Sequence, residues 1–193
     1  LLQILKDQEN DIYNKYKKIL DSEIDSIKQW KTGEKIYYQG EKFSIIRNIT
    51  DSKQISIALQ PDNKILLIEV PKDLEQNIIK QTVDKAIKKL FKNNTEVLIA
   101  KKLPCWSKIT GFKYDEFKIR DATTRYGSCM PSKKNVYFSS RLIMLPEDKV
   151  DAIIVHELCH FIEPNHSPRF YAEVKKRMFD YKKRMKILEE KHV

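Results

Sequence analysis

The chain has few cysteines and no paired cysteine motif. Only Cys105, Cys129 and Cys159 are cysteine among 193 residues, and they lie far apart with no Cys-x-x-Cys pair. This pattern excludes a disulfide framework. It is typical of small buried thiols in a reducing compartment, so we expect a cytoplasmic protein.

Long apolar runs are also missing. No segment approaches the roughly 18–20 apolar residues that a membrane span needs. Residues 1–7 lack the basic flank, apolar stretch and cleavage site of a secretory signal. With 41% hydrophobic and 33% charged residues, the composition predicts one soluble globular domain with no membrane partner.

Positive charge is in excess, with 37 Lys and Arg against 27 Asp and Glu and a net charge of +10. The excess is strongest in residues 175–186. Such a run could attract phosphate groups or an acidic partner, or it could be the solvated face of a helix. The sequence leaves both interpretations open.

The first half of the chain predicts a helix, a small sheet and a second helix. Apolar residues recur at spacings of three and four over residues 6–30, which favours an amphipathic helix. Apolar stretches separated by turn residues predict an antiparallel β-meander over 35–70, with strands at 35–38, 43–46, 54–59 and 65–70. Pro71 then opens a helix that runs to about Phe91, and Leu103-Pro104 and Thr110-Gly111 break the segment that follows.

The second half predicts two strands and two helices. The strands cover 116–120 and 136–140. Pro146 opens a helix with acidic residues in its first turn, and Pro164 ends it. Ser167-Pro168 then starts a long C-terminal helix that runs to about Glu190. The fold class predicted by these elements is α+β.

Histidine is scarce, yet three of the four histidines fall in residues 156–166. His156 and His160 form a His-Glu-x-x-His motif, and side chains four apart share one face of a helix. Zinc binds imidazole nitrogens at about 2.0–2.1 Å, and a catalytic zinc keeps three protein ligands and one open position. We therefore expect His156, His160 and His166 to hold one zinc ion, with Glu157 as the general base. Manganese, cobalt or nickel could take the place of zinc, since the order of affinities alone does not set which metal is bound.

Other residues compete for roles at this site. Glu163 could replace His166 as the third ligand, although it lies at a helix end cut by Pro164. By residue type and neighbourhood, the groups that could steady a developing oxyanion are Arg125, Tyr126 and Tyr171. For Arg125 the alternative is a structural ion pair, and for Tyr171 it is packing on the last helix.

The order of these motifs resembles the YgjP-like metallopeptidase family, whose members are zincin-type, SprT-related metal-dependent hydrolases. The resemblance rests on residues 124–129, the strand that ends in Ser140-Arg141-Leu142, the histidine motif, and residues 165–170. It is specific over residues 112–190, weaker over 35–70, and does not clearly cover 1–30. Tyr126 stands where the family usually has tryptophan. Glu163 stands where the metzincins have glycine, so we do not assign that class.

The resemblance implies a zincin-like core with an active-site helix and a substrate-binding edge strand. Carried over by position, residues 136–140 would be that edge, and a peptide can join an edge as an extra strand. It also implies an organisation into an N-terminal helical segment (1–32), a β-meander with a helix (33–110), and a catalytic core (111–193).

We therefore predict a zinc-dependent metallopeptidase that acts on a peptide or protein. Zinc lowers the pKa of a bound water to about 7 and polarises the scissile carbonyl. One alternative keeps the metal but hydrolyses a nucleotide phosphoanhydride, which the basic residues would suit. Another is a DNA-associated processing module, by analogy with SprT-related proteins. Glu157 argues against a purely structural metal site, which needs no base.

Overall fold

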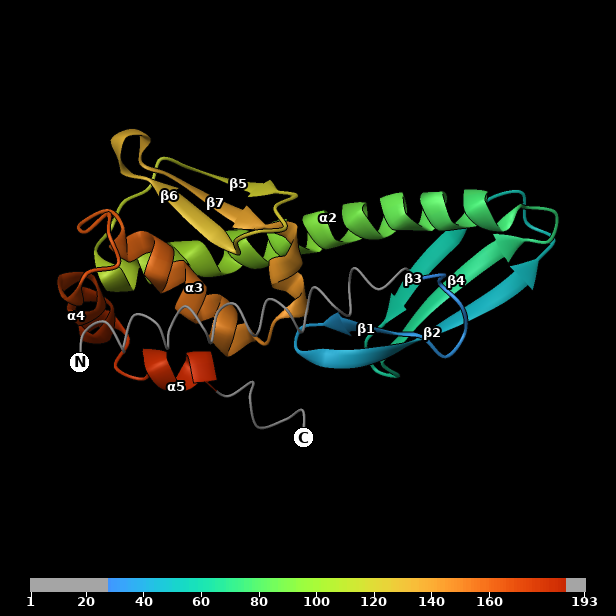
Figure 1. Cartoon of the computed structure of the whole chain (residues 1–193), viewed down its shortest axis with the longest axis horizontal. Helices are drawn as coiled ribbons and strands as arrows, with labels where there is room; N and C mark the ends of the chain where they lie inside the picture. The colour runs from blue at the N-terminus through green and yellow to red at the C-terminus, as the bar shows by residue number, and fades with distance from the viewer. Residues whose placement is uncertain (1–27, 187–193) are drawn as a thin grey trace.

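One long helix joins two small β-sheets in the computed structural model, which describes residues 28–186 (Figure 1). This helix, α2 (Gln76–Thr110), contacts both sheets, and the shorter helices gather beside the second sheet. Most of the helix expected over residues 6–30 lies outside the described residues, and residues 28–30 are not helical. The two sheets and four helices of residues 28–186 make this a mixed α/β fold, which is compatible with the expected α+β class.

The first sheet contains the expected strands in an unexpected order. Its strands are β1 (Lys35–Tyr38), β2 (Glu41–Thr50), β3 (Ser56–Gln60) and β4 (Ile65–Pro71), and they lie in the order β1-β2-β4-β3. Because β4 pairs in parallel with β2, the prediction of a purely antiparallel meander is wrong. The physical reason is burial. Leu66, Ile68 and Val70 of β4 are at most 2% exposed, so this strand takes a central place and β3 moves to the edge.

Helix α2 is much longer than the predicted segment, which ended near residue 91. It begins at Gln76, after Pro71, and continues through Pro104. A proline inside a helix removes one backbone hydrogen bond. Here Ile99 and Leu103 are fully buried beside it, so packing of the helix outweighs this local cost. The helix ends at the second of the two breaks that the sequence indicated, Gly111, whose φ of 78° suits glycine and whose N–H donates to Ser107 O at 2.9 Å.

The second sheet contains β5 (Glu116–Arg120), β6 (Gly127–Met130) and β7 (Asn135–Ser139). Their order is β5-β7-β6, with β7 parallel to β5 and antiparallel to β6. The strand expected at 136–140 therefore exists, but it is the central strand, and its assignment as the substrate-binding edge is wrong. Val136 and Phe138 are at most 1% exposed, which explains its central place. Of the two edge strands, β6 lies against the helix that carries the histidine motif.

Three helices complete the described part of the chain. Helix α3 (Glu147–Cys159) carries the histidine motif and is followed by α4 (Pro168–Arg177) and α5 (Tyr181–Lys186). The expected single C-terminal helix is thus broken, and the part beyond residue 186 lies outside the described residues. The break falls at Met178, which adopts extended backbone and is 3% exposed. Burying both Met178 and Tyr181 turns the chain back along α3.

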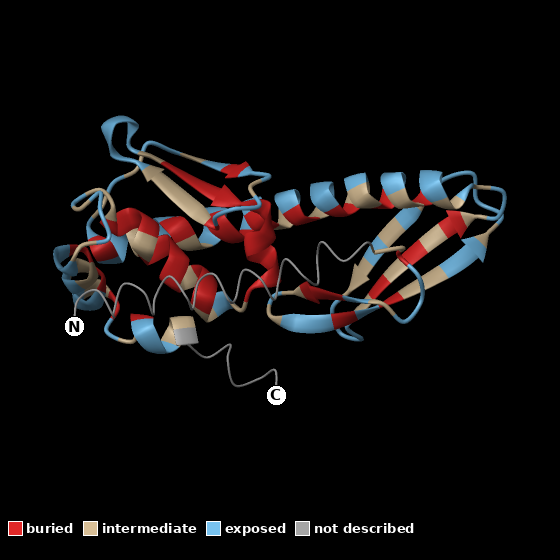
Figure 2. Cartoon of the chain, in the orientation of Figure 1, coloured by how far each residue is buried: buried red, intermediate tan, exposed pale blue. Residues whose placement is uncertain are grey.

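A shared core holds the two sheets together. One cluster of buried side chains extends from Trp30 to Leu158, and Figure 2 shows the buried residues concentrated where α2, α3 and β7 meet. The β1–β2 turn also docks on the segment before α3: Gln39 N–H donates to Ile143 O at 2.6 Å and Gly40 N–H to Met144 O at 3.0 Å. The division at residues 32 and 110 stays a prediction. No helix within residues 28–186 is long and apolar enough to cross a membrane.

Candidate metal centre

Helix α3 places the first two histidines. Glu147 and Asp148 lie in its first turn. Acidic side chains there stabilise the helix because its N-terminal end carries a partial positive charge. Its apolar residues anchor it in the core, and Ile154, Val155 and Leu158 are fully buried. His156 lies in the last turn and His160 immediately follows it.

The connection between α3 and α4 returns the third histidine to the first two. His166 lies just before Ser167, which caps α4 by accepting a hydrogen bond from Phe170 N–H at 3.2 Å. Phe170 is fully buried, and its ring centroid lies 4.8, 4.5 and 5.0 Å from those of His156, His160 and His166. All three imidazoles therefore pack against the apolar ring of Phe170.

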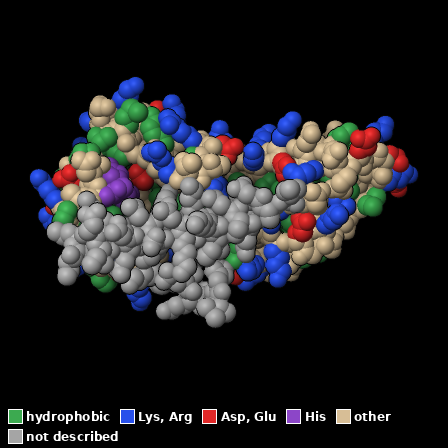
Figure 3. All heavy atoms as spheres, viewed as in Figure 1, with side chains coloured by type: hydrophobic (Ala, Val, Ile, Leu, Met, Phe, Trp, Pro, Cys, Tyr) green, Lys and Arg blue, Asp and Glu red, His purple; other side chains and the backbone are tan. Residues whose placement is uncertain are grey.

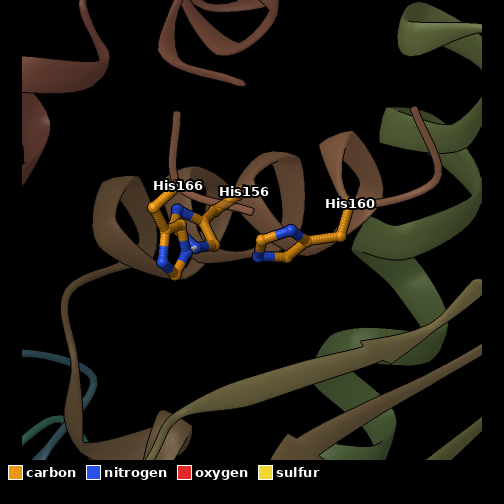
Figure 4. Close-up of side chains that lie close together, drawn as sticks. All are labelled: His156, His160 and His166. Atoms are coloured by element: carbon orange, nitrogen blue, oxygen red, sulfur yellow. Dashed lines mark hydrogen bonds between the residues drawn. The ribbon is translucent and has the colours of Figure 1, made fainter. Parts of the chain in front are cut away.

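The three histidines converge as the motif predicted. Each offers a nitrogen that lies within 4.8 Å of the other two, and the Nε2 atoms of His156 and His166 are 2.8 Å apart. Figure 4 shows the ring of His166 against that of His156, with the ring of His160 pointing toward both. They reach the surface at the end of the molecule that carries α3 and α4 (Figure 3). Three nearby imidazoles form a donor set that suits zinc.

The surroundings of the histidines keep them neutral, as metal ligands must be. Burial lowers the pKa of His156 well below 6.5, and the charges of His160 and His166 lower it further. Burial also lowers the pKa of His160, against a hydrogen bond to the Glu163 backbone. The pKa of His166 is lowered by burial and then by the charge of His160. At neutral pH all three therefore present lone pairs.

Two of the rings are held from outside the cluster. His160 Nδ1 lies 3.0 Å from the backbone oxygen of Glu163, and His156 Nδ1 lies 2.9 Å from Tyr181 Oη. Both contacts leave Nε2 directed toward the cluster. Hydrogen bonds of this kind fix the ring orientation and tautomer of a metal-binding histidine. The contribution of Tyr181 was missed, because no local pattern connects it with a residue 25 positions earlier.

Glu157 lies beneath strand β6, beside the histidines. Its side chain is 6% exposed, and burial raises its pKa to about 8 while the charge of Arg125 lowers it. Gly127 of β6 approaches very closely: a Cβ atom there would lie 2.5 Å from Glu157 Oε1. Sequence reasoning did not single out Gly127, although its place in the Arg-Tyr-Gly-Ser-Cys segment was a signal.

Arg125 comes from a loop that the end of β7 holds in place. Ser139 Oγ donates to Ala122 O at 2.7 Å, and Arg141 Nη1 donates to Thr123 O at 3.0 Å. Arg141, which belongs to the Ser140-Arg141-Leu142 segment of the family resemblance, and the nearby Ser139 thus support the loop before Arg125. Arg125 itself is exposed, and its charge acts on Glu157. Its role in catalysis stays a prediction.

The other candidates have different positions. Tyr126 is 6% exposed and its backbone oxygen accepts from Ser139 N–H at 2.8 Å. Tyr171 stacks on His166 with ring centroids 6.2 Å apart. Glu163 pairs with Arg169, with a distance of 3.8 Å between Oε2 and Nε. Glu163 is not in the described group that could bind a metal.

The cysteines and the basic residues are not part of the described group that could bind a metal. Burial raises the pKa of Cys129 to about 12 and that of Cys159 to about 11, so both thiols stay protonated. In the basic run, Arg177 pairs with Glu173 and Arg184 with Asp180 at 2.9 Å. The remaining lysines of this run with described side chains are exposed: Lys175, Lys176, Lys182 and Lys183. This arrangement matches the solvated helix face that the sequence allowed.

The mixed α/β fold and the three-histidine group beside a buried glutamate are compatible with a protein of the metallopeptidase class. The sequence model of the YgjP-like metallopeptidase domain matches residues 1–191, so the chain belongs to this family. The match extends the resemblance to residues 1–30, which the motifs did not cover. The family points to a metal-dependent peptidase and to protein or peptide substrates, and it lends no support to a nucleic-acid partner. Comparisons with curated proteins and with solved structures return no significant match.

Proposed function

We propose that the protein is a zinc-dependent peptidase in which His156, His160 and His166 hold the ion. The convergence of three neutral imidazoles beside a buried glutamate carries this proposal. A structural zinc site is normally closed by four protein ligands. Within the described residues the group contains three, which suits a catalytic site with an open position.

Glu157 is the general base in this proposal. When bound, zinc would polarise the scissile carbonyl and lower the pKa of a coordinated water. The Glu157 carboxylate takes a proton from the attacking water and passes it to the leaving amine. It must be ionised to do so, and the positive charge of Arg125 favours that form. A cation held by the adjacent histidines would act in the same direction.

The substrate in this proposal joins strand β6 as an additional strand. Ser139 N–H donates to Tyr126 O, so these two residues form a hydrogen-bonded pair of the antiparallel ladder. Because such pairs alternate, Gly127 and Cys129 direct their backbone N–H and C=O groups away from β7. These groups lie at the open edge of the sheet, on the strand that covers Glu157. An extended peptide bonded to them would run past the candidate base.

Metal content and hydrolysis, measured together on wild type and Glu157→Gln, test this function. We expect both proteins to hold about one zinc ion, by the stoichiometry of such sites. Only the wild type should cleave casein, because Gln cannot accept the proton. A panel of nucleoside triphosphates examines the phosphoanhydride alternative: cleavage of a nucleotide in place of casein would replace the peptidase proposal. If purified wild type held no stoichiometric zinc after incubation with excess zinc, the proposed metal site itself would be wrong.

Proline at position 129 tests the substrate strand. Proline removes one backbone N–H, and at this position the lost N–H faces the open edge rather than β7. We expect Cys129→Pro to raise KM for peptides, while Cys129→Ala, which removes the same thiol but keeps the N–H, stays close to wild type. An unchanged unfolding midpoint shows that the sheet persists. Equal KM values for the two variants would contradict pairing at this edge.

A further inference from the structure

Helix α5 reaches the metal centre through one side chain. Tyr181 is 8% exposed, and its Oη lies 2.9 Å from His156 Nδ1. The two rings stack at an interplanar angle of 23° with centroids 6.2 Å apart. Tyr181 packs in a second core cluster that also includes Val155, Phe170 and Met178. The phenol is therefore held in place by packing, with its oxygen on a candidate zinc ligand.

We propose that Tyr181 is a positioning residue that orients His156 for zinc, and that α5 acts as a clamp that presents it. This inference rests on the proposed function, because it takes the three histidines as the zinc ligands. Tyr181 does not touch the ion or the substrate in this proposal. It acts only through the ring of His156.

The direction of the hydrogen bond follows from the roles of the two imidazole nitrogens. His156 Nε2 lies in the cluster, 2.8 Å from His166 Nε2, so it is the nitrogen available to the ion. A neutral imidazole that coordinates through Nε2 keeps its hydrogen on Nδ1. That hydrogen would be donated to Tyr181 Oη, which fixes the tautomer and prevents the ring from turning. Partners of this kind typically change metal affinity by about 10–100-fold.

Polar contacts along α3 hold α5 in the position that this role requires. Arg184 Nη1 lies 3.7 Å from Asp151 Oδ2, and Lys149 Nζ donates to Met185 O at 3.0 Å. Positions 181, 184 and 185 of α5 thus meet positions 156, 151 and 149 of α3. This order shows that the two helices run antiparallel. Helix α5 is therefore held at both ends, by Tyr181 at its first residue and by the contacts of Arg184 and Met185 near its last.

His160 shows the contrasting case. Its Nδ1 contacts the backbone oxygen of Glu163, only three residues away, so that contact forms whenever the local turn forms. The partner of His156 lies 25 residues further along the chain. Full zinc affinity therefore requires that α5 is docked, which couples metal binding to the C-terminal part of the described chain.

Zinc affinity of Tyr181→Phe tests the proposal, because Phe keeps the ring and removes the hydroxyl. Affinity is measured by competition with a chromogenic chelator, which needs no activity. We expect affinity to fall about 10–100-fold while the unfolding midpoint of the metal-free protein changes little. Tyr38→Phe is the matched control, since it removes a hydroxyl of β1, in the first sheet, that accepts a hydrogen bond from Asn94 of α2. This control should bind zinc like wild type.

A second variant separates positioning from general loosening of the fold. Arg184→Gln removes the contact with Asp151, and we expect a smaller loss of zinc affinity in the wild-type background. In the Tyr181→Phe background the same change should have no further effect, because the clamp acts through Tyr181.

The outcomes distinguish this inference from the proposed function. Wild-type affinity in Tyr181→Phe, or additive losses in the double variant, would overturn the role of Tyr181 while zinc binding by wild type left the site intact. If wild type itself bound no zinc, the proposed function would fail first.

Discussion

Replacing Gly127 by alanine gives a sharp test of the packing over Glu157. A Cβ atom at position 127 would lie 2.5, 2.6 and 2.7 Å from Oε1, Cγ and Cδ of Glu157. All of these distances are shorter than side chains tolerate. Gly127 is not among the described glycines with positive φ, so alanine meets no backbone strain there. The effect of Gly127→Ala therefore depends on the Glu157 side chain.

The structure predicts opposite signs in two backgrounds. With Glu157 present, the added methyl group overpacks the site, which typically costs about 1–3 kcal/mol. In Glu157→Ala all three contacting atoms are gone. Gly127→Ala should then be neutral, or should stabilise by about 0.4–1 kcal/mol by restricting the unfolded chain. The coupling energy between the two positions should accordingly be about 1–4 kcal/mol, the sum of these ranges.

A double-mutant cycle measures this coupling. The four proteins are unfolded with urea in the presence of a chelator at pH 6, below the pKa of about 8 that burial gives Glu157 in the folded wild type. In the zinc-loaded protein, Gly127→Ala should also lower kcat/KM, because misplacement of a catalytic group by about 1 Å costs on the order of 100-fold. An equal loss of stability in both backgrounds would refute the reasoning, since it would locate the cost outside the contact with Glu157.

Three further predictions concern charge and metal. Because burial raises the pKa of Glu157 from 4.5 to about 8, wild type should lose stability relative to Glu157→Gln as pH rises through this window. The difference in unfolding free energy between the two proteins grows by about 1.4 kcal/mol per pH unit at most. It reaches an upper bound of about 5 kcal/mol and levels off above this pH window. The unfolding free energies of the two metal-free proteins are measured with urea from pH 5 to 9. A difference between them that does not change with pH would contradict the burial of this carboxyl. Arg125→Ala should raise the pKa of Glu157 and move the acidic limb of the kcat/KM profile to higher pH, whereas Arg125→Lys should restore it. An unmoved limb in Arg125→Ala would show that the charge does not act on the base. Zinc at 100 times its Kd should stabilise wild type by about 2.7 kcal/mol and so raise its Tm. The Tm of His160→Ala should stay unchanged when zinc is added. Equal zinc-induced shifts in scanning calorimetry would remove His160 from the ligand set.

The convergence of the three histidines was predictable because its geometry is almost entirely local. His156 and His160 share a helix face by their spacing of four, and the buried character of α3 could be read from its apolar residues. The chain reversal that returns His166 follows from Pro164 and from the cap at Ser167. The pairing of β2 with β4 was not predictable in this way. Period-two alternation identifies a strand, but several strands of similar composition compete for the central place.

Local signals also misjudged the two long helices, for opposite reasons. Pro104 indicated a break that does not occur, because residues buried before and after it let α2 continue through it. The periodic segment after Ser167 indicated one helix, yet the burial of Met178 and Tyr181 divides it into α4 and α5. In both segments, burial against the core outweighs the propensity of single residues.

The ligand set and the candidate base are thus properties of a short stretch of sequence, since one helix, one turn and one cap suffice to arrange them. What surrounds them depends on contacts between distant segments. The edge strand that covers Glu157, the close approach of Gly127 and the hydroxyl of Tyr181 each come from a different part of the chain. Such contacts follow from how the whole core packs, and no spacing within a single segment encodes them.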